Sequence, residues 1–240
     1  MNEHFITPDW PVSHDIHAIT SLRTGGFSKG SFSTLNLASH VGDNLLSVTK
    51  NRSFLREALS LPGEPLWLKQ SHRNQVRNAA VAGSKEADAS YTRDKGVVCA
   101  VLTADCLPVL LCNPDTGSVA AVHAGWRGLL LGVIEATLAE LGNKKMAWLG
   151  PAIGPDAFEV GDDVRDSFVS KSDCFKPAFR AQSAHKWLAD IYAISRIILR
   201  QNNVTQIYGG GFCTYSESKR FFSYRREGVT GRMATLIWRQ

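Results

Sequence analysis

The stretch GVVCAVLTADCLPVLLCN, residues 96–113, decides the fold, because it is almost wholly apolar until Thr103–Cys106 interrupts it. Continuous apolar runs bounded by turn residues are typical of strands buried on both faces. The turn signal NPDTG at 113–117 follows, and SVAAVHAGWRG at 118–128 then predicts a second buried strand that ends at His123. Cys106 and His123 thus lie where rigid strands give way to polar or small residues, a common position for site residues.

Outward from this centre, strand and helix patterns mix without a regular βαβ alternation. We therefore expect an α+β fold, a single domain over residues 1–240 with mixed β-sheets flanked by helices. The last two expected strands are predicted to pair as a hairpin around residues 227–231. Expected strands cover 16–22, 65–72, 75–81, 146–150, 205–212, 221–226 and 232–238, and expected helices cover 47–60 (with Ser47 as a cap), 128–141, 161–170 and 187–200.

Composition limits the class of protein. Of the 240 residues 44% are hydrophobic, which is enough for a substantial core, and no apolar run is long enough to span a membrane. The first residues lack the basic start and apolar run of a signal peptide, so a cytoplasmic location is expected. The five cysteines are irregularly spaced, as expected of reduced thiols. The net charge of +5 favours anionic ligands, but no run of basic residues indicates nucleic acid.

Cys106 and His123 can face each other if the turn between them closes an antiparallel hairpin. A buried structural cysteine and a hydrogen-bonded core histidine explain the same pair equally well. Asp105 favours a site, because a carboxylate inside an apolar run is costly unless it is paired. Its expected partner is a ligand histidine or Arg127. His72, in a polar stretch, would complete a His-Cys-His set with one open position, typical of catalytic zinc. A metal-free Cys–His nucleophile is the competing interpretation.

Basic residues near glycines suggest anion binding. The segment HAGWRG offers two glycines for close backbone approach and Arg127 at the start of a helix, an arrangement that suits an anion. The loop that begins RTGG could form a backbone nest for phosphate assisted by Arg23. Near the end of the chain, Arg225, Arg226 and Arg232 gather beside Tyr224 and could grip phosphate or stack on a base. A capping turn, a surface loop and a solvated hairpin are the ordinary alternatives.

Several long motifs resemble the YfiH-like family. They are TADCLPVLLCN, VAAVHAGWRG, WLGPAIGPDAFEVG, CTY and FFSYRREGVTGRMA. Members have been described as polyphenol oxidases (laccase-domain proteins) and as purine nucleoside phosphorylases. The resemblance implies an α+β fold shared with cysteine hydrolase-like proteins and a metal site of His72, Cys106 and His123. It also implies phosphorolysis of adenosine, inosine and methylthioadenosine, together with adenosine deamination.

The resulting hypothesis is a zinc-dependent purine nucleoside phosphorylase with adenosine deaminase activity. His72, Cys106 and His123 are the expected metal ligands and catalytic residues. The expected substrate-binding residues are Arg23, Arg127 and Arg225. Expected partners are purine nucleosides and phosphate, without nucleic acid or membrane, and a homodimer is allowed.

Two alternative enzymes remain. A copper polyphenol oxidase is one, although the chain has no His-x-His pair for a multinuclear cluster, and copper could bind the same three ligands. A cysteine hydrolase or amidase that edits peptidoglycan precursors is the other, with Cys106 as nucleophile and His123 as base.

Overall fold

The central stretch forms the strands that carry the candidate site. In the computed structural model, which describes residues 3–240, these strands are β5 (Val98–Thr103), β6 (Leu107–Cys112) and β7 (Val119–Ala124), and all of their residues are buried. Strands β6 and β7 pair antiparallel, with Pro108 opposite His123. The turn at 113–117 therefore closes an antiparallel hairpin, which brings Cys106, just before β6, to the same end of the sheet as His123.

Two sheets build the body of the protein. The larger sheet has the order β12 (Gln206–Gly209), β8 (Met146–Leu149), β6, β7, β4 (Ala89–Thr92) and β3 (Val76–Asn78). The smaller sheet has the order β1 (Phe5–Ile6), β2 (Ile16–Ser21), β13 (Met233–Arg239) and β5. Strands β12 and β8 pair in parallel, as do β3 and β4, whereas the other pairs in these sheets are antiparallel. The mixed sheet confirms the predicted α+β class.

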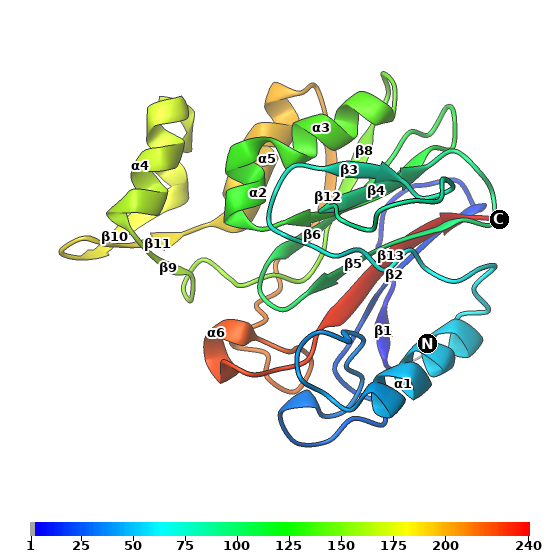
Figure 1. Ribbon diagram of the computed structural model, residues 1–240. Coiled ribbons are helices and arrows are strands. Elements are labelled where there is room, and N and C mark those ends of the chain that lie inside the picture. Colours follow the sequence, from blue (N-terminus) through cyan, green and yellow to red (C-terminus); the bar gives the residue numbers. More distant parts are fainter. Residues whose placement is uncertain (1–2) are drawn as a thin grey trace.

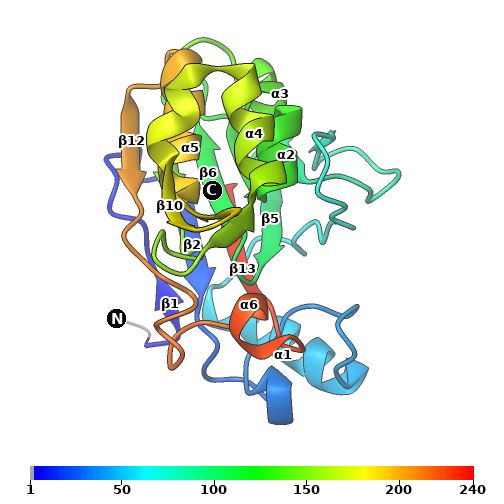
Figure 2. The same ribbon diagram turned by 90° about the vertical axis from the view of Figure 1, so that its left-hand side faces the viewer.

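The body has four layers (Figures 1 and 2). The two sheets face each other, and alternate residues of each strand fill the space between them, because successive side chains point to opposite faces. In β6, Leu110 and Cys112 pack between the sheets, whereas Val109 and Leu111 pack under the helices. Helices α2 (Trp126–Leu131), α3 (Val133–Glu140) and α5 (Ile191–Gln201) cover the larger sheet, and α1 (Leu45–Ala58) covers the smaller one.

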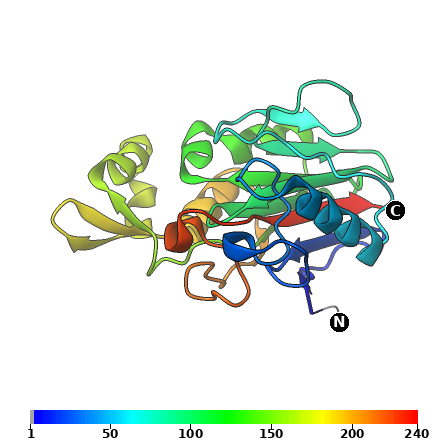
Figure 3. The ribbon, with the colours of Figure 1, turned by 60° about the horizontal axis from the view of Figure 1, so that its bottom comes forward.

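A three-stranded antiparallel sheet with one helix projects from one side of the body (Figures 1 and 3). It contains β9 (Glu159–Gly161), α4 (Asp162–Lys171), a 3-10 helix (Asp173–Ala178), β10 (Phe179–Ser183) and β11 (Lys186–Ala189). The helix predicted for 187–200 is therefore wrong at its start. Residues 187–189 pair with β9 or β10 in β11, and α5 begins only after Asp190, whose side chain accepts a hydrogen bond from the Ala193 N–H.

Four other predicted elements differ. The strand predicted for 65–72 forms only isolated bridges, at Leu66 and Lys69. Helix α1 is capped by Asn44 instead of Ser47, because the Asn44 side chain accepts from the first backbone N–H groups. The helix predicted for 128–141 is two helices, α2 and α3, that meet at Gly132 with φ of 87°. The strand predicted for 221–226 is wrong: the short helix α6 (Tyr224–Glu227) forms there, capped by Ser223.

The predicted terminal hairpin is also wrong, because β13 pairs with β2 and β5. A further 3-10 helix (Gly30–Phe32) lies in the long loop before α1. Among residues 3–240, no helix is long and apolar enough to cross a membrane.

Candidate metal centre between two cavities

The bend between β5 and β6 presents Cys106. Asp105 adopts a left-handed backbone conformation with φ of 90°, which is uncommon for a residue other than glycine and is found often at functional sites. Its carboxylate accepts hydrogen bonds of 2.6 Å from the Thr214 hydroxyl and of 2.6 Å from the Arg225 backbone N–H. The expected pairing of Asp105 with a histidine or with Arg127 is therefore wrong, since this carboxylate instead holds α6 against the site.

The partner of the histidines is Asp88, which the sequence analysis missed. Its buried carboxylate lies 2.8 Å from His123 Nδ1 and accepts the backbone N–H groups of His72 and Arg73 at 2.8 Å each. Burial raises the pKa of Asp88, but the hydrogen bonds from His123 and Arg73 outweigh it and lower the pKa below its usual value. One carboxylate thus orients the His123 ring and fixes the loop that carries His72. The only signal in the sequence is an acidic residue directly before the buried strand β4.

His72, Cys106 and His123 converge on one point. Their donor atoms all lie within 4.8 Å of one another, and Cys106 Sγ is 3.8 Å from His72 Nε2. Gly125 permits this approach, because a Cβ atom there would lie 3.0 Å from the His72 ring and 3.1 Å from Cys106 Sγ. The structure therefore brings together the three residues that the sequence analysis named as ligands.

The donor set fits a zinc or copper ion. Zinc binds thiolate at about 2.3 Å and imidazole at about 2.0–2.1 Å, so donors that share the ion lie roughly 3.3–3.6 Å apart in tetrahedral geometry. The 3.8 Å between Cys106 Sγ and His72 Nε2 is close to this separation. The Asp88 carboxylate is hydrogen-bonded to His123 Nδ1, so Nε2 is left for the ion. This is the usual carboxylate–histidine–metal arrangement. Three protein ligands would leave one coordination position open.

The electrostatics of the cluster favour a thiolate. Burial raises the pKa of the Cys106 thiol, but His123 and His72 outweigh it and lower the pKa to about 6. Burial likewise lowers the pKa of His123, but Cys106 and Asp88 outweigh it and raise the pKa to about 9. Without metal, the pair is therefore a thiolate beside an imidazolium at neutral pH. The same arrangement supports a metal site or a Cys106–His123–Asp88 nucleophile.

Two cavities meet at the cluster. The first cavity, of about 350 Å³, is lined by His40, Gln70, Thr103, Arg232 and all three cluster residues. The second cavity, of about 310 Å³, is lined by Trp126, Arg127, Phe158 and Arg225, together with His72, Asp105 and Cys106. Tyr224, the first residue of α6, is 59% exposed and lines both cavities. A reaction centre at Cys106 is thus open to ligands from two sides.

The arginines that the sequence suggested for anion or substrate binding lie at different positions relative to the two cavities. Arg127 lies over the Trp126 ring at 4.2 Å, and Arg225 donates to the Glu159 carbonyl at 3.0 Å, both on the second cavity. Arg232, noted in the sequence beside Tyr224, lines the first cavity.

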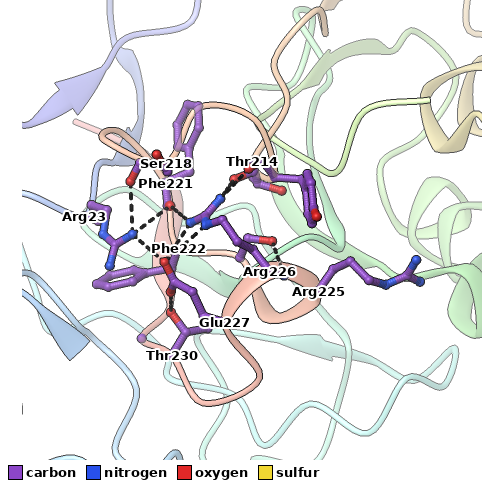
Figure 4. Close-up of polar contacts among 12 residues, drawn as sticks. Arg23, Thr214, Ser218, Phe221, Phe222, Arg225, Arg226, Glu227 and Thr230 are labelled. Carbon is purple, nitrogen blue, oxygen red and sulfur yellow. Dashed lines mark hydrogen bonds and ion pairs between the residues drawn. The ribbon is translucent and has the colours of Figure 1, made fainter. Parts of the chain in front are cut away.

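Arg23 is not brought to either cavity. Its guanidinium bonds Glu227 at 2.7 Å and the Ser218 carbonyl at 3.0 Å (Figure 4). Arg226 joins the same network through Glu227 and the Thr214 carbonyl. These two arginines support the segment that carries α6, because they bind the carbonyls and the carboxylate that surround it.

The chain is similar to known proteins over nearly its whole length. A family model described as multi-copper polyphenol oxidoreductase laccase matches residues 17–240. The purine nucleoside phosphorylase YfiH of Shigella flexneri is 50% identical over 238 residues, covering 97% of this chain and 98% of that protein. A purine nucleoside phosphorylase of Haemophilus influenzae is 46% identical, covering 97% of this chain and 98% of that protein.

Solved structures of related proteins share the fold over nearly the whole chain. A protein of Neisseria meningitidis matches with a TM-score of 0.95 at 46% identity, covering 99% of this chain and 100% of that one. YlmD from Geobacillus stearothermophilus matches with a TM-score of 0.92 at 30% identity, covering 100% and 97%. The fold and the cluster define an α+β protein with a candidate metal centre between two cavities. The chain belongs to the YfiH-like family of laccase-domain proteins, and the names of its relatives support an enzyme.

Proposed function

We propose that this protein is a zinc-dependent purine nucleoside phosphorylase that acts on adenosine, inosine and methylthioadenosine and also deaminates adenosine. The observation that carries the proposal is the convergence of His72, Cys106 and His123 where two cavities meet. The names of the relatives support phosphorolysis as the reaction class. A cytoplasmic location and a homodimer remain predictions.

The second cavity suits the nucleoside. Trp126, Phe158 and Tyr224 line it, and aromatic faces stack on any purine base. Arg127 and Arg225, which lie over the first two of these rings, can bind the polar edges of the base or the ribose hydroxyls. We assign these two arginines to substrate binding and leave Arg23 to the network around Glu227.

His72, Cys106 and His123 would hold the metal, and Asp88 would keep the His123 ring in the tautomer that binds it. When bound, zinc supplies Lewis acidity at its open coordination position. The protein's own residues orient the substrate: Asp105 fixes the backbone of Arg225, and α6 places Tyr224 between the two cavities.

Two other functions have a specific observation in their favour. The family model is described as a polyphenol oxidoreductase, and copper(II) binds nitrogen and sulfur donors more tightly than zinc does. The Cys106–His123–Asp88 arrangement, with the pKa of Cys106 lowered to about 6, also suits a cysteine hydrolase.

One set of assays separates the phosphorylase from the oxidase. The protein is analysed for metal and incubated with adenosine and phosphate, and the products are separated by chromatography. Adenine with ribose 1-phosphate reports phosphorolysis, and inosine reports deamination. Both should be lost in Cys106→Ala but retained in the control Cys174→Ala, whose thiol is exposed and lines neither cavity.

Nucleoside activity that is unchanged in Cys106→Ala would overturn the proposal. Oxidation of phenols after copper loading, without nucleoside turnover, would favour the oxidase. Nucleoside turnover that persists after complete metal removal would contradict a zinc enzyme.

A further inference from the structure

The lining of the first cavity is rich in potential donors and holds no carboxylate. Its polar side chains are those of His40, Gln70, Thr103 and Arg232, beside the cluster and Tyr224. The Gln70 amide is already used, since it donates to the Leu102 carbonyl and accepts from the Leu102 N–H. The groups left for a ligand are therefore the Arg232 guanidinium, the His40 ring and the hydroxyls of Thr103 and Tyr224.

Arg232 is a half-buried cation on which the charges of Cys106 and Asp105 act without a salt bridge among the described residues. Its Nη1 donates to the carbonyls of Thr230 at 2.8 Å and Gly231 at 3.0 Å. Within the described part of the chain it forms no ion pair, whereas Arg23 and Arg226 both pair with Glu227. Burying a charge is costly unless an opposite charge compensates it, so a bound anion would stabilise this guanidinium.

Thr103 provides a second, independent observation. Its side chain is 1% exposed, and its hydroxyl has no hydrogen-bond partner among residues 3–240. Buried hydroxyl groups are normally paired, because an unpaired one loses its bonds to water. A ligand oxygen in the cavity that Thr103 lines would supply the missing partner.

The local potential agrees with these contacts. Burial, followed by the charges of Arg232 and Arg52, lowers the pKa of His40 on the same cavity. Arg232 and Arg52 thus contribute positive potential at His40, which favours an anion there.

We propose that the first cavity is the phosphate subsite, in which the Arg232 guanidinium and the Thr103 hydroxyl bind a tetrahedral oxyanion beside the cluster. This inference rests on the proposed function for the identity of the anion. The nucleoside then occupies the second cavity, and the two ligands meet where both cavities share His72, Cys106 and Tyr224.

This division places the reactants on two sides of the bond that changes. A phosphate oxygen forms a bond to C1′ of the ribose, and the C1′–N9 bond breaks with its electron pair leaving on the purine. The proton of hydrogen phosphate ends on the purine nitrogen, so the products are the free base and ribose 1-phosphate. Arg232 stays charged throughout and offsets the charge of the phosphate.

The test measures phosphate and inosine binding separately by titration calorimetry on the zinc-loaded protein. The variants are Arg232→Gln and Thr103→Val, and the control Arg56→Gln removes the same charge from an exposed position on α1. We expect Arg232→Gln to weaken phosphate binding by roughly 10- to 100-fold and Thr103→Val by roughly 3- to 10-fold. Inosine binding, measured without phosphate, should be unchanged in both variants.

Thr103→Val distinguishes a loss of phosphate binding from a loss of folding. The variant has nearly the same shape and loses an unpaired hydroxyl, so its melting temperature should equal or exceed that of the wild type, while phosphate raises it less. A structural role for the hydroxyl would instead lower the melting temperature.

Wild-type phosphate affinity in both variants would overturn the inference, as would phosphate binding that depends on Arg225 instead of Arg232. Repeating the titration after metal removal distinguishes phosphate held by the metal alone, which would also overturn it. Phosphate binding that requires Arg232 in a protein that cleaves no nucleoside would support the anion site and contradict only the proposed function. Sulfate at the same concentrations shows whether the site selects phosphate among tetrahedral oxyanions.

Discussion

The buried Asp88 carboxylate holds the His123 ring and the loop that carries His72, and Asp88→Asn tests this role. The variant keeps the size of the side chain but removes its charge and replaces one acceptor oxygen with a donor group. The carboxylate is bound by His123 Nδ1 and the N–H groups of His72 and Arg73, each at 2.8 Å, and more loosely by the N–H and hydroxyl of Ser71 at 3.2 and 3.4 Å. At least one of these donors loses its partner whichever way the amide turns.

The expected magnitude follows from burial. Hydrogen bonds to a charged group contribute about 1.5–3 kcal/mol each, and breaking a buried ion pair costs about 3–5 kcal/mol. We therefore expect Asp88→Asn to lower the free energy of unfolding of the metal-free protein by about 3–5 kcal/mol. Since Asp88 also orients a ligand histidine, zinc affinity should fall by roughly 10- to 100-fold.

Urea denaturation measures the first effect, and competition for zinc with a chromophoric chelator measures the second. Asp115→Asn is the matched control, because its carboxylate is exposed and pairs only with the exposed Lys144 among the described residues. If Asp88→Asn does not fold, Asp88→Glu keeps the charge and should retain a folded protein with weakened zinc binding. Wild-type stability and wild-type zinc affinity in Asp88→Asn would refute the reasoning.

Three further substitutions test the surroundings of the cluster. Gly125→Ala places a Cβ 3.0 Å from the His72 ring, so we expect lower zinc content and a loss of about 1–3 kcal/mol in stability, measured by metal analysis and urea denaturation. Burial raises the pKa of Glu227, but hydrogen bonds, among them that from Arg23, lower it overall. Its stabilisation is therefore present above the ordinary glutamate pKa and lost as the pH falls below it, so Glu227→Gln should destabilise at pH 7 by about 1–3 kcal/mol and progressively less below about pH 4.5. Asp105→Asn should raise the KM for inosine by about tenfold through a displaced α6 while zinc content stays unchanged.

The outcomes that would contradict these expectations are specific. Wild-type zinc content in Gly125→Ala would show that the cluster can move away from the new methyl group. A stability difference for Glu227→Gln that stays constant from pH 7 to pH 3 would assign the effect to packing. Zinc loss in Asp105→Asn would give Asp105 a direct role at the metal.

The central strands could be predicted from the sequence because the signals are local. The apolar runs on both sides of 113–117 fix β6 and β7, and their pairing places Cys106 near His123 without further information. Asp88 could not be found this way. Its partner His123 is 35 positions along the chain, and nothing near Asp88 indicates that a carboxylate will face a histidine ring.

The wrong secondary-structure predictions for 221–226 and for the start of 187–200 have a physical cause. Phe221 and Phe222 give 221–226 the apolar and aromatic pattern of a strand, but both side chains are buried in a small cluster with Met233. Ser223 caps α6, and Asp105 accepts the Arg225 N–H, so the backbone is satisfied without strand pairing. Tertiary contacts likewise decide residues 187–189, which pair with β9 or β10 although their pattern continues that of the helix α5.

The choice between a metal ligand and a nucleophile can be made at Cys106 itself. Because the pKa of its thiol is lowered to about 6, the metal-free protein should present a thiolate at pH 7 that reacts readily with iodoacetamide. Burial raises the pKa of Cys99 and Cys112 to about 12, so these thiols should stay unmodified in the folded protein. Exposed Cys174 serves as the reference thiol in the same sample.

Zinc bound to His72, Cys106 and His123 would coordinate the thiolate and so slow alkylation of Cys106, but it would not slow alkylation of Cys174. Peptide mass mapping after brief alkylation, with and without zinc, measures both rates in one sample. Protection of Cys106 by zinc, together with nucleoside turnover only in the protected form, supports the metal centre. Equal alkylation of Cys106 with and without zinc would mean that the thiolate is not a ligand, and the cysteine hydrolase would then explain the lowered pKa and the Asp88–His123 pair better than the phosphorylase does.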